Sequence, residues 1–191
     1  MSLRVLALTG LPGAGKSTVA SLAEAQGLPV ISMGDAVREE LRRRNLEPTS
    51  ENFNSLTVGL RREYGDAAIA VLTLELIRKR GYLGTPELIV DGVRSLAEVE
   101  HMKGWPQVES VKVLAVLAPF KDRFVRLYGR GREGDPKTEN DLRNRDWAEL
   151  SIGLGNLIAL ADVFLVNEGD METFMQKATS KLKMWRDQGD P

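Results

Sequence analysis

The chain has 191 residues, and 26 basic against 27 acidic side chains give it a formal net charge of -1. This balance provides no overall attraction to nucleic acid or to an anionic membrane, so any anion-binding surface must be local. Because the sequence has no cysteine and only one histidine, it excludes disulfides, thiolate zinc sites and histidine-rich metal sites.

The length favours a single domain over residues 1–191. The N-terminus runs directly into a strand-like segment and lacks the pattern of a secretory signal. The longest apolar runs fall well short of the ~20 residues that a membrane helix needs. We therefore expect a cytoplasmic protein with neither nucleic acid nor a membrane as a partner. The sequence does not indicate an oligomeric state.

Short apolar runs alternate with helical patterns along the whole chain. In order, we predict a strand at 5–8, a helix at 17–26, a strand at 29–32, a helix at 35–44 and helical structure over 51–80 with a break near Gly65. A strand at 88–90, a helix at 95–103, a strand at 111–117 and a helix at 120–128 follow. A turn-rich segment then precedes a helix from 138, a strand at 163–166 and a helix at 171–186. This alternation predicts a doubly wound α/β domain, with a five-stranded parallel sheet and helices on both of its faces.

One glycine-rich segment directly follows the first predicted strand. It matches the pattern G-x-x-x-x-G-K-[ST] in full, with Gly10, Leu11, Pro12, Gly13, Ala14, Gly15, Lys16 and Ser17. Glycines let backbone N–H groups approach phosphate oxygens, and the helix that follows points its positive end at the anion. We predict that this P-loop, together with Thr18, binds ATP. Lys16 would act on the β- and γ-phosphates as a catalytic residue, and Ser17 would bind Mg²⁺.

A carboxylate ends the third predicted strand. Asp91 follows an apolar run that is suited to lie beside the first strand, where a carboxylate can hold a water of the Mg²⁺ shell. The alternative is that Asp91 only forms a turn with Gly92. Since a P-loop needs a metal partner of this kind, we predict a Mg²⁺ site made by Ser17 and Asp91.

Arginines gather between residues 119 and 147. Arg123, Arg126 and Arg130 have the spacing i, i+3, i+7, which puts them on one stripe of a helix. Because phosphoryl transfer spreads negative charge over the γ-phosphate oxygens, we predict that these residues and Arg132 are catalytic. Arg143 and Arg145 add donors from the helix that follows, and residues 129–137 form a predicted lid. The alternative is a salt-bridged surface, since Asp135, Asp146 and other acidic residues are interleaved with them.

Two further segments resemble the adenylate kinases. Residues 31–38 (ISMGDAVR) are similar to the segment in which the second strand of that family leads into an acceptor-binding helix with an arginine. Residues 89–94 (IVDGVR) are similar to its Asp-Gly segment, although one residue fewer separates the glycine from the arginine. The order of P-loop, acceptor helix, Asp-Gly strand and arginine-rich lid extends over nearly the whole chain. It most resembles the adenylate-kinase-related proteins of archaea, and more distantly dephospho-coenzyme A kinase.

The resemblance implies a P-loop NTPase fold of the nucleotide-kinase type, with an acceptor-binding helical region at about 35–80. It implies an acceptor site formed by Asp35, Arg38 and Arg94, to which we add Arg143. For Arg38 the alternative is a solvated position among the neighbouring arginines of its helix.

The residues and the resemblance together predict an ATP-dependent phosphotransferase with Mg²⁺ as cofactor. It would move the γ-phosphoryl group of ATP to a small phosphorylated acceptor, with a nucleoside monophosphate as the first candidate. No residue here identifies a base, so a dephospho-coenzyme A kinase-like activity is an alternative, as is a non-catalytic ATP-binding regulatory protein. The chain lacks the Asn-Lys-x-Asp motif that a GTPase would normally carry.

Overall fold

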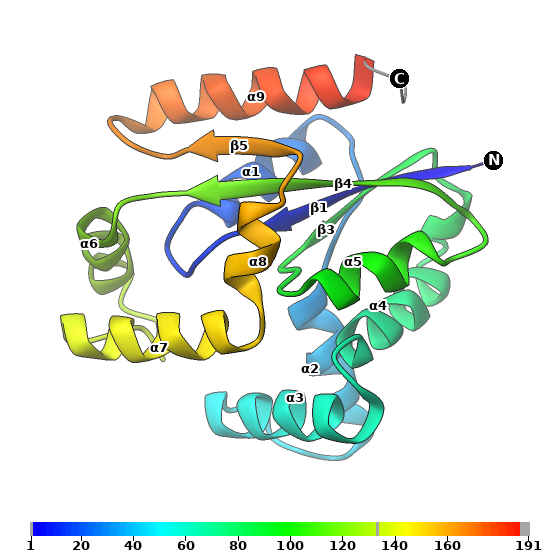
Figure 1. The fold of residues 1–191 in the computed structure, drawn as a ribbon, viewed down its shortest axis with the longest axis horizontal. Helices are drawn as coiled ribbons and strands as arrows, with labels where there is room; N and C mark the ends of the chain where they lie inside the picture. The colour runs from blue at the N-terminus through cyan, green and yellow to red at the C-terminus, as the bar shows by residue number, and fades with distance from the viewer. Residues whose placement is uncertain (1, 133, 188–191) are drawn as a thin grey trace.

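The computed structural model describes residues 2–132 and 134–187. In it, strands β1 (Leu3–Thr9), β2 (Val30–Ser32), β3 (Glu87–Asp91), β4 (Val108–Leu117) and β5 (Val163–Val166) form a five-stranded sheet in the order β2-β3-β1-β4-β5 (Figure 1). Every neighbouring pair is parallel. The predicted five-stranded parallel sheet is therefore confirmed.

Helices cover both faces of the sheet, as expected for strands that are apolar on both sides. Helices α1 (Lys16–Ala25) and α9 (Met171–Asp187) pack on one face, where Phe174 and Leu182 meet Leu6 and Leu8 of β1. On the other face, Val5 and Ala7 of β1 meet α2 (Met33–Arg43), α4 (Ala68–Lys79), α5 (Leu96–Lys103) and α8 (Leu154–Ala159). Alternate residues of β1 therefore pack into two separate hydrophobic cores, because successive side chains of a strand point to opposite faces.

The remaining helices extend beyond the sheet. Helix α3 (Ser50–Tyr64) packs on α2 and α4, and the short 3-10 helix η1 (Tyr82–Gly84) precedes β3. Helices α6 (Phe120–Arg130) and α7 (Glu139–Ser151) lie beyond the carboxyl end of β4 (Figure 1). Ligands of open α/β sheets bind at this edge of the strands. In the described part of the chain, no helix is long and apolar enough to cross a membrane.

Several predicted boundaries differ from the structure for local reasons. Helix α2 begins at Met33 rather than at the predicted residue 35, because the hydroxyl of Ser32 accepts from the backbone N–H of Gly34 and caps the helix; Asp35 lies in the first turn. Helix α6 continues through Arg130 and ends at Gly131, whose φ of 61° is left-handed. The connecting segment therefore begins at Gly131 rather than at residue 129. Glu133, within the predicted lid, lies outside the described residues, and α8 was not predicted.

Candidate active site

The P-loop connects β1 to α1 in a conformation that requires glycine. Gly10 has a φ of +138°, and a Cβ there would lie 2.2 Å from the carbonyl oxygen of Val116 in β4. Gly15 has a φ of +114°, and a Cβ there would lie 2.4 Å from the side-chain nitrogen of Asn167. No side chain fits either position, so the loop backbone can pack closely against the sheet while its N–H groups remain available to an anion.

Asn167 braces this loop from the end of β5. Its side-chain Nδ2 donates to the backbone carbonyl oxygen of Ala14 at 2.7 Å, and its backbone carbonyl oxygen accepts from Nη2 of Arg126 at 3.1 Å. Asn167 is buried, and it joins the P-loop to α6. Asn167 was not predicted at this site, although it is a polar side chain directly after a predicted strand.

Lys16 bonds to the loop itself. Its Nζ donates to the carbonyl oxygen of Gly10 at 2.6 Å and to that of Leu11 at 3.3 Å. Burial lowers the pKa of Lys16 to about 8, and of the charges around it Arg94 acts in the same direction while Asp91 opposes the shift. A bound phosphate would provide a negatively charged hydrogen-bond partner for this ammonium group, whose present partners are neutral carbonyl oxygens.

Asp91 lies beside the loop because β3 pairs with β1 in a register that matches Leu8 with Asp91. Its Oδ1 is buried and has no hydrogen-bond partner in the described residues. Burial raises the pKa of this carboxyl group, against the opposing effect of Lys16. A free carboxylate oxygen and the exposed hydroxyl of Ser17 are both hard oxygen ligands, and both residues line one cavity. The residues present therefore fit the predicted Mg²⁺.

This cavity has a volume of about 350 Å³ and lies between the P-loop, the carboxyl end of β3, α6, α7 and the start of α9. Most of its charged residues are cationic, and Asp91 and Glu149 are the acidic ones. The residues that line it are Gly10, Pro12, Gly13, Gly15, Lys16, Ser17, Thr18, Asp91, Gly92, Val93, Arg94, Arg126, Leu127, Arg130, Arg145, Glu149, Asn167 and Met171. An excess of positive charge in a partly enclosed site favours a polyanionic ligand.

The predicted catalytic arginines divide between the cavity and its surroundings. Arg126 lines the cavity, and its Nη1 is buried without a hydrogen-bond partner among residues 2–132 and 134–187. Arg130 also lines it and binds both carboxylate oxygens of Asp135. Arg123 does not line the cavity. It is buried against Asp146, with N···O distances of 2.8 and 2.7 Å, and donates to the carbonyl oxygen of Pro12 at 3.1 Å.

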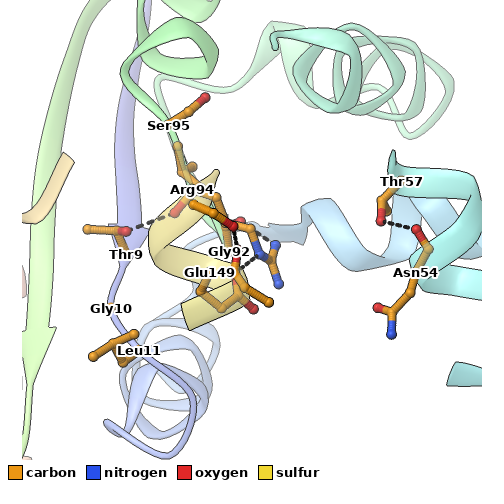
Figure 2. Close-up of polar contacts among 12 residues, drawn as sticks. Thr9, Gly10, Leu11, Asn54, Thr57, Gly92, Arg94, Ser95 and Glu149 are labelled. Carbon is orange, nitrogen blue, oxygen red and sulfur yellow. Dashed lines mark hydrogen bonds and ion pairs between the residues drawn. The ribbon is translucent and has the colours of Figure 1, made fainter. Parts of the chain in front are cut away.

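Of the predicted acceptor residues, Arg94 reaches the cavity. Its Nε donates to Glu149 at 2.6 Å (Figure 2). Arg38 lies outside the cavity lining and pairs with Asp35 at 2.6 Å on the surface of α2.

The other predicted arginines also lie outside the lining. Arg143 stacks over the ring of Phe120 at 4.5 Å, and Arg132 is exposed. Glu149 and Met171 were not predicted at this site, and Arg145 was predicted only as an additional donor. Glu149 and Arg145 lie four residues apart on α7, the spacing that puts two side chains on one face of a helix.

A parallel sheet with a complete G-x-x-x-x-G-K-S loop after β1, and a carboxylate at the end of β3, defines a P-loop protein with a kinase-like fold. A family profile described as "AAA domain" matches residues 9–143. The UPF0200 protein of Thermococcus kodakarensis is 43% identical over 170 residues, which cover 89% of this chain and 91% of that protein. The UPF0200 protein of Hyperthermus butylicus is 44% identical over 185 residues, covering 97% and 96%. The chain belongs to the AAA domain family and to the UPF0200 proteins.

Solved structures share the fold at low sequence identity. Shikimate kinase from Bacteroides thetaiotaomicron matches with a TM-score of 0.59 and 16% identity, over 96% of this chain and 98% of that chain. A gluconokinase from Sinorhizobium meliloti matches with a TM-score of 0.55 and 16% identity, over 95% and 92%. The fold is therefore that of the P-loop kinases, and the predicted resemblance to P-loop kinase-like proteins of archaea is confirmed.

Proposed function

We propose that this protein is an ATP-dependent phosphotransferase that moves the γ-phosphoryl group of ATP to a small phosphorylated acceptor, with a nucleoside monophosphate as the first candidate. One observation carries the proposal. In a single cavity the P-loop meets Asp91 and arginines from α6, α7 and the segment after β3. Arginines on several sides suit a reaction in which charge spreads over a transferred phosphoryl group.

The P-loop, Asp91 and three of the cavity arginines have proposed roles. Lys16 and backbone N–H groups of the P-loop would bind the β- and γ-phosphates, and Arg126 would direct its free Nη1 at a phosphate oxygen. Ser17 and Asp91 would hold Mg²⁺, which neutralises phosphate charge when it is bound. Arg130 and Arg145 would stabilise the phosphoryl group in transfer.

The acceptor phosphate is assigned first to Arg94, because that arginine lines the cavity. Asp35 and Arg38 are proposed to bind the remainder of the acceptor. Arg123 would act indirectly, by joining α6, Asp146 and the P-loop. Arg132 and Arg143 would contribute only after the lid moves.

The proposal is tested by measuring ADP formation from MgATP with a panel of acceptors. The panel contains nucleoside monophosphates and dephospho-coenzyme A, with shikimate and gluconate as acceptors that carry no phosphate. We expect at least one phosphorylated acceptor to raise the rate by about a hundredfold or more over water, because positioning of the acceptor is a large part of catalysis. Tight ATP binding without acceleration by any member would favour a regulatory protein instead.

We also propose that residues 131–137 act as a lid that closes over the bound substrates. Asp135 binds Arg130, and the carbonyl oxygen of Gly134 accepts from Arg145 at 3.3 Å, so the segment is held by two arginines of the cavity. When the phosphates of bound substrates attract Arg130 and Arg145, the segment should move with these side chains and exclude water from the cavity. Backbone amides across 131–137 should exchange slowly once a bisubstrate analogue is bound. Protection confined to residues 10–18 would contradict a lid.

A further inference from the structure

Glu149 is an acidic residue in a cavity that is suited to anions. It lies on α7, and its Oε2 accepts from Nε of Arg94 at 2.6 Å, with side-chain exposures of 16% for Glu149 and 29% for Arg94 (Figure 2). A carboxylate here repels any incoming phosphate, and none of the proposed steps of phosphoryl transfer uses it. A role for Glu149 must therefore come from its contact with Arg94.

Arg94 is fixed from several directions. Its Nη1 donates to the carbonyl oxygen of Gly92 at 2.8 Å, and its backbone N–H donates to Oε2 of Glu98 at 2.7 Å. Glu98 is fully buried and also accepts from Nη2 of Arg61 on α3 at 3.0 Å. Thr9 holds the same segment, because its hydroxyl donates to the carbonyl oxygen of Val93 at 2.8 Å (Figure 2).

These contacts occupy Nε and Nη1 of Arg94 and leave Nη2 free. Nη2 has no hydrogen-bond partner in the part of the chain that the structure describes, and Arg94 lines the cavity. A guanidinium group is planar, so two bonds on different nitrogens set the direction of the third. Glu149 supplies the bond that comes from a different element of the fold.

Helix α7 links Glu149 to the rest of the site. Asp146, three residues earlier, binds Arg123, which in turn donates to the P-loop carbonyl of Pro12. Arg145 lines the cavity from the same helix. One helix therefore contacts the phosphate loop through Asp146 and the acceptor arginine through Glu149.

We propose that Glu149 is a positioning residue that orients Arg94 so that its free Nη2 receives a phosphate of the acceptor. This inference rests on the proposed function, because it assigns the acceptor phosphate to Arg94. The proposed role also predicts whether removal of Glu149 weakens or tightens phosphate binding. If Glu149 only competed for Arg94, its removal would tighten phosphate binding, whereas removal of a positioning residue weakens it.

The first test observes Arg94 without any ligand. In ¹⁵N-labelled protein, the Nε–H signal of Arg94, assigned by its loss in Arg94→Lys, should be protected from exchange with water. It should lose that protection in Glu149→Ala and keep it in Glu149→Gln, whose amide oxygen can still accept. An unchanged signal in Glu149→Ala would overturn the proposal.

The second test uses inorganic phosphate as the probe, titrated into protein saturated with the Mg²⁺ complex of a non-hydrolysable ATP analogue, so that the β- and γ-phosphate positions of the P-loop are filled. We expect Glu149→Ala to weaken phosphate binding about tenfold, the loss typical of a charge-assisted hydrogen bond. Glu149→Gln should stay within about twofold, because its amide oxygen can still orient Arg94 and the lost charge of that bond is offset by the lost repulsion of phosphate. Glu139→Gln, a change at an exposed position of the same helix, is the matched control and should bind as the wild type does.

Equal or tighter phosphate binding in Glu149→Ala would overturn the positioning role. Should that variant fail to fold, Glu149→Asp, which withdraws the carboxylate by one methylene group, takes its place with the same expectation. Both tests are separate from turnover. If no acceptor accelerates ADP formation, the proposed phosphotransfer fails while these measurements still decide whether Glu149 orients Arg94.

Discussion

Replacing Lys16 with alanine should lower acceptor-dependent ADP formation by about two to three decades, since preorganised electrostatic stabilisation of this kind contributes ~3–4 kcal/mol to a transition state. The fold should not suffer. Burial lowers the pKa of Lys16 to about 8, so the native state disfavours the charged ammonium group, and alanine removes that penalty. Thermal unfolding should therefore show a melting temperature no lower than that of the wild type.

The pKa of Lys16 also predicts how ATP affinity depends on pH. A triphosphate binds the protonated form of Lys16, which predominates in the free protein below pH 8 or so. ATP affinity should be level below that pH and fall as the pH rises above it, because binding must then add a proton. The step should vanish in Lys16→Ala, which separates it from the titration of Asp91 nearby. Near-normal turnover in a folded Lys16→Ala protein would exclude the P-loop as the catalytic site.

Replacing Asp91 with asparagine should raise the Mg²⁺ concentration needed for half-maximal turnover by about 10- to 100-fold, the loss typical of groups that orient a metal's ligands. The substitution keeps the shape of the side chain and removes its charge. Turnover at saturating ATP and fixed Mg²⁺ should fall accordingly, and added Mg²⁺ should recover part of it.

Although Asp91→Asn should lower turnover, it should raise the thermal stability of the protein. Burial raises the pKa of Asp91, and its Oδ1 has no hydrogen-bond partner within residues 2–132 and 134–187. A carboxyl group whose folded pKa is raised stabilises the protein when protonated, and this contribution is lost as the pH rises through that pKa. Above that pKa the charged side chain is therefore destabilising, and Asp91→Asn should there unfold at a higher temperature than the wild type. A destabilised variant with unchanged Mg²⁺ dependence would show that Asp91 is a structural turn residue.

The P-loop and the strands of a parallel sheet could be predicted because their signals are local. The glycines, Lys16 and Ser17 are consecutive, and the end of a buried strand brings Asp91 to the same edge. The start of α2 was misjudged for a local reason as well. Ser32 and Asp35 are both good capping residues, and the geometry of β2 decides in favour of Ser32.

Pairings over long distances in the chain could not be predicted in this way. Arg123 pairs with Asp146 rather than with the other acidic residues nearby, because packing of α6 against α7 buries that pair. Asn167 meets the P-loop across 153 positions, and Arg94 meets Glu149 across 55. A sequence shows which residues are charged, but the choice of partner depends on how distant helices pack.

Transfer of an isotopic label tests most directly whether the γ-phosphoryl group of ATP reaches an acceptor in this cavity. The protein would be incubated with ATP carrying ¹⁸O in its γ-phosphoryl group and with the acceptor panel, and the products identified by mass. We predict an acceptor heavier by one labelled phosphoryl group, absent with Lys16→Ala. Labelled inorganic phosphate alone, with every acceptor recovered at its original mass, would contradict the account.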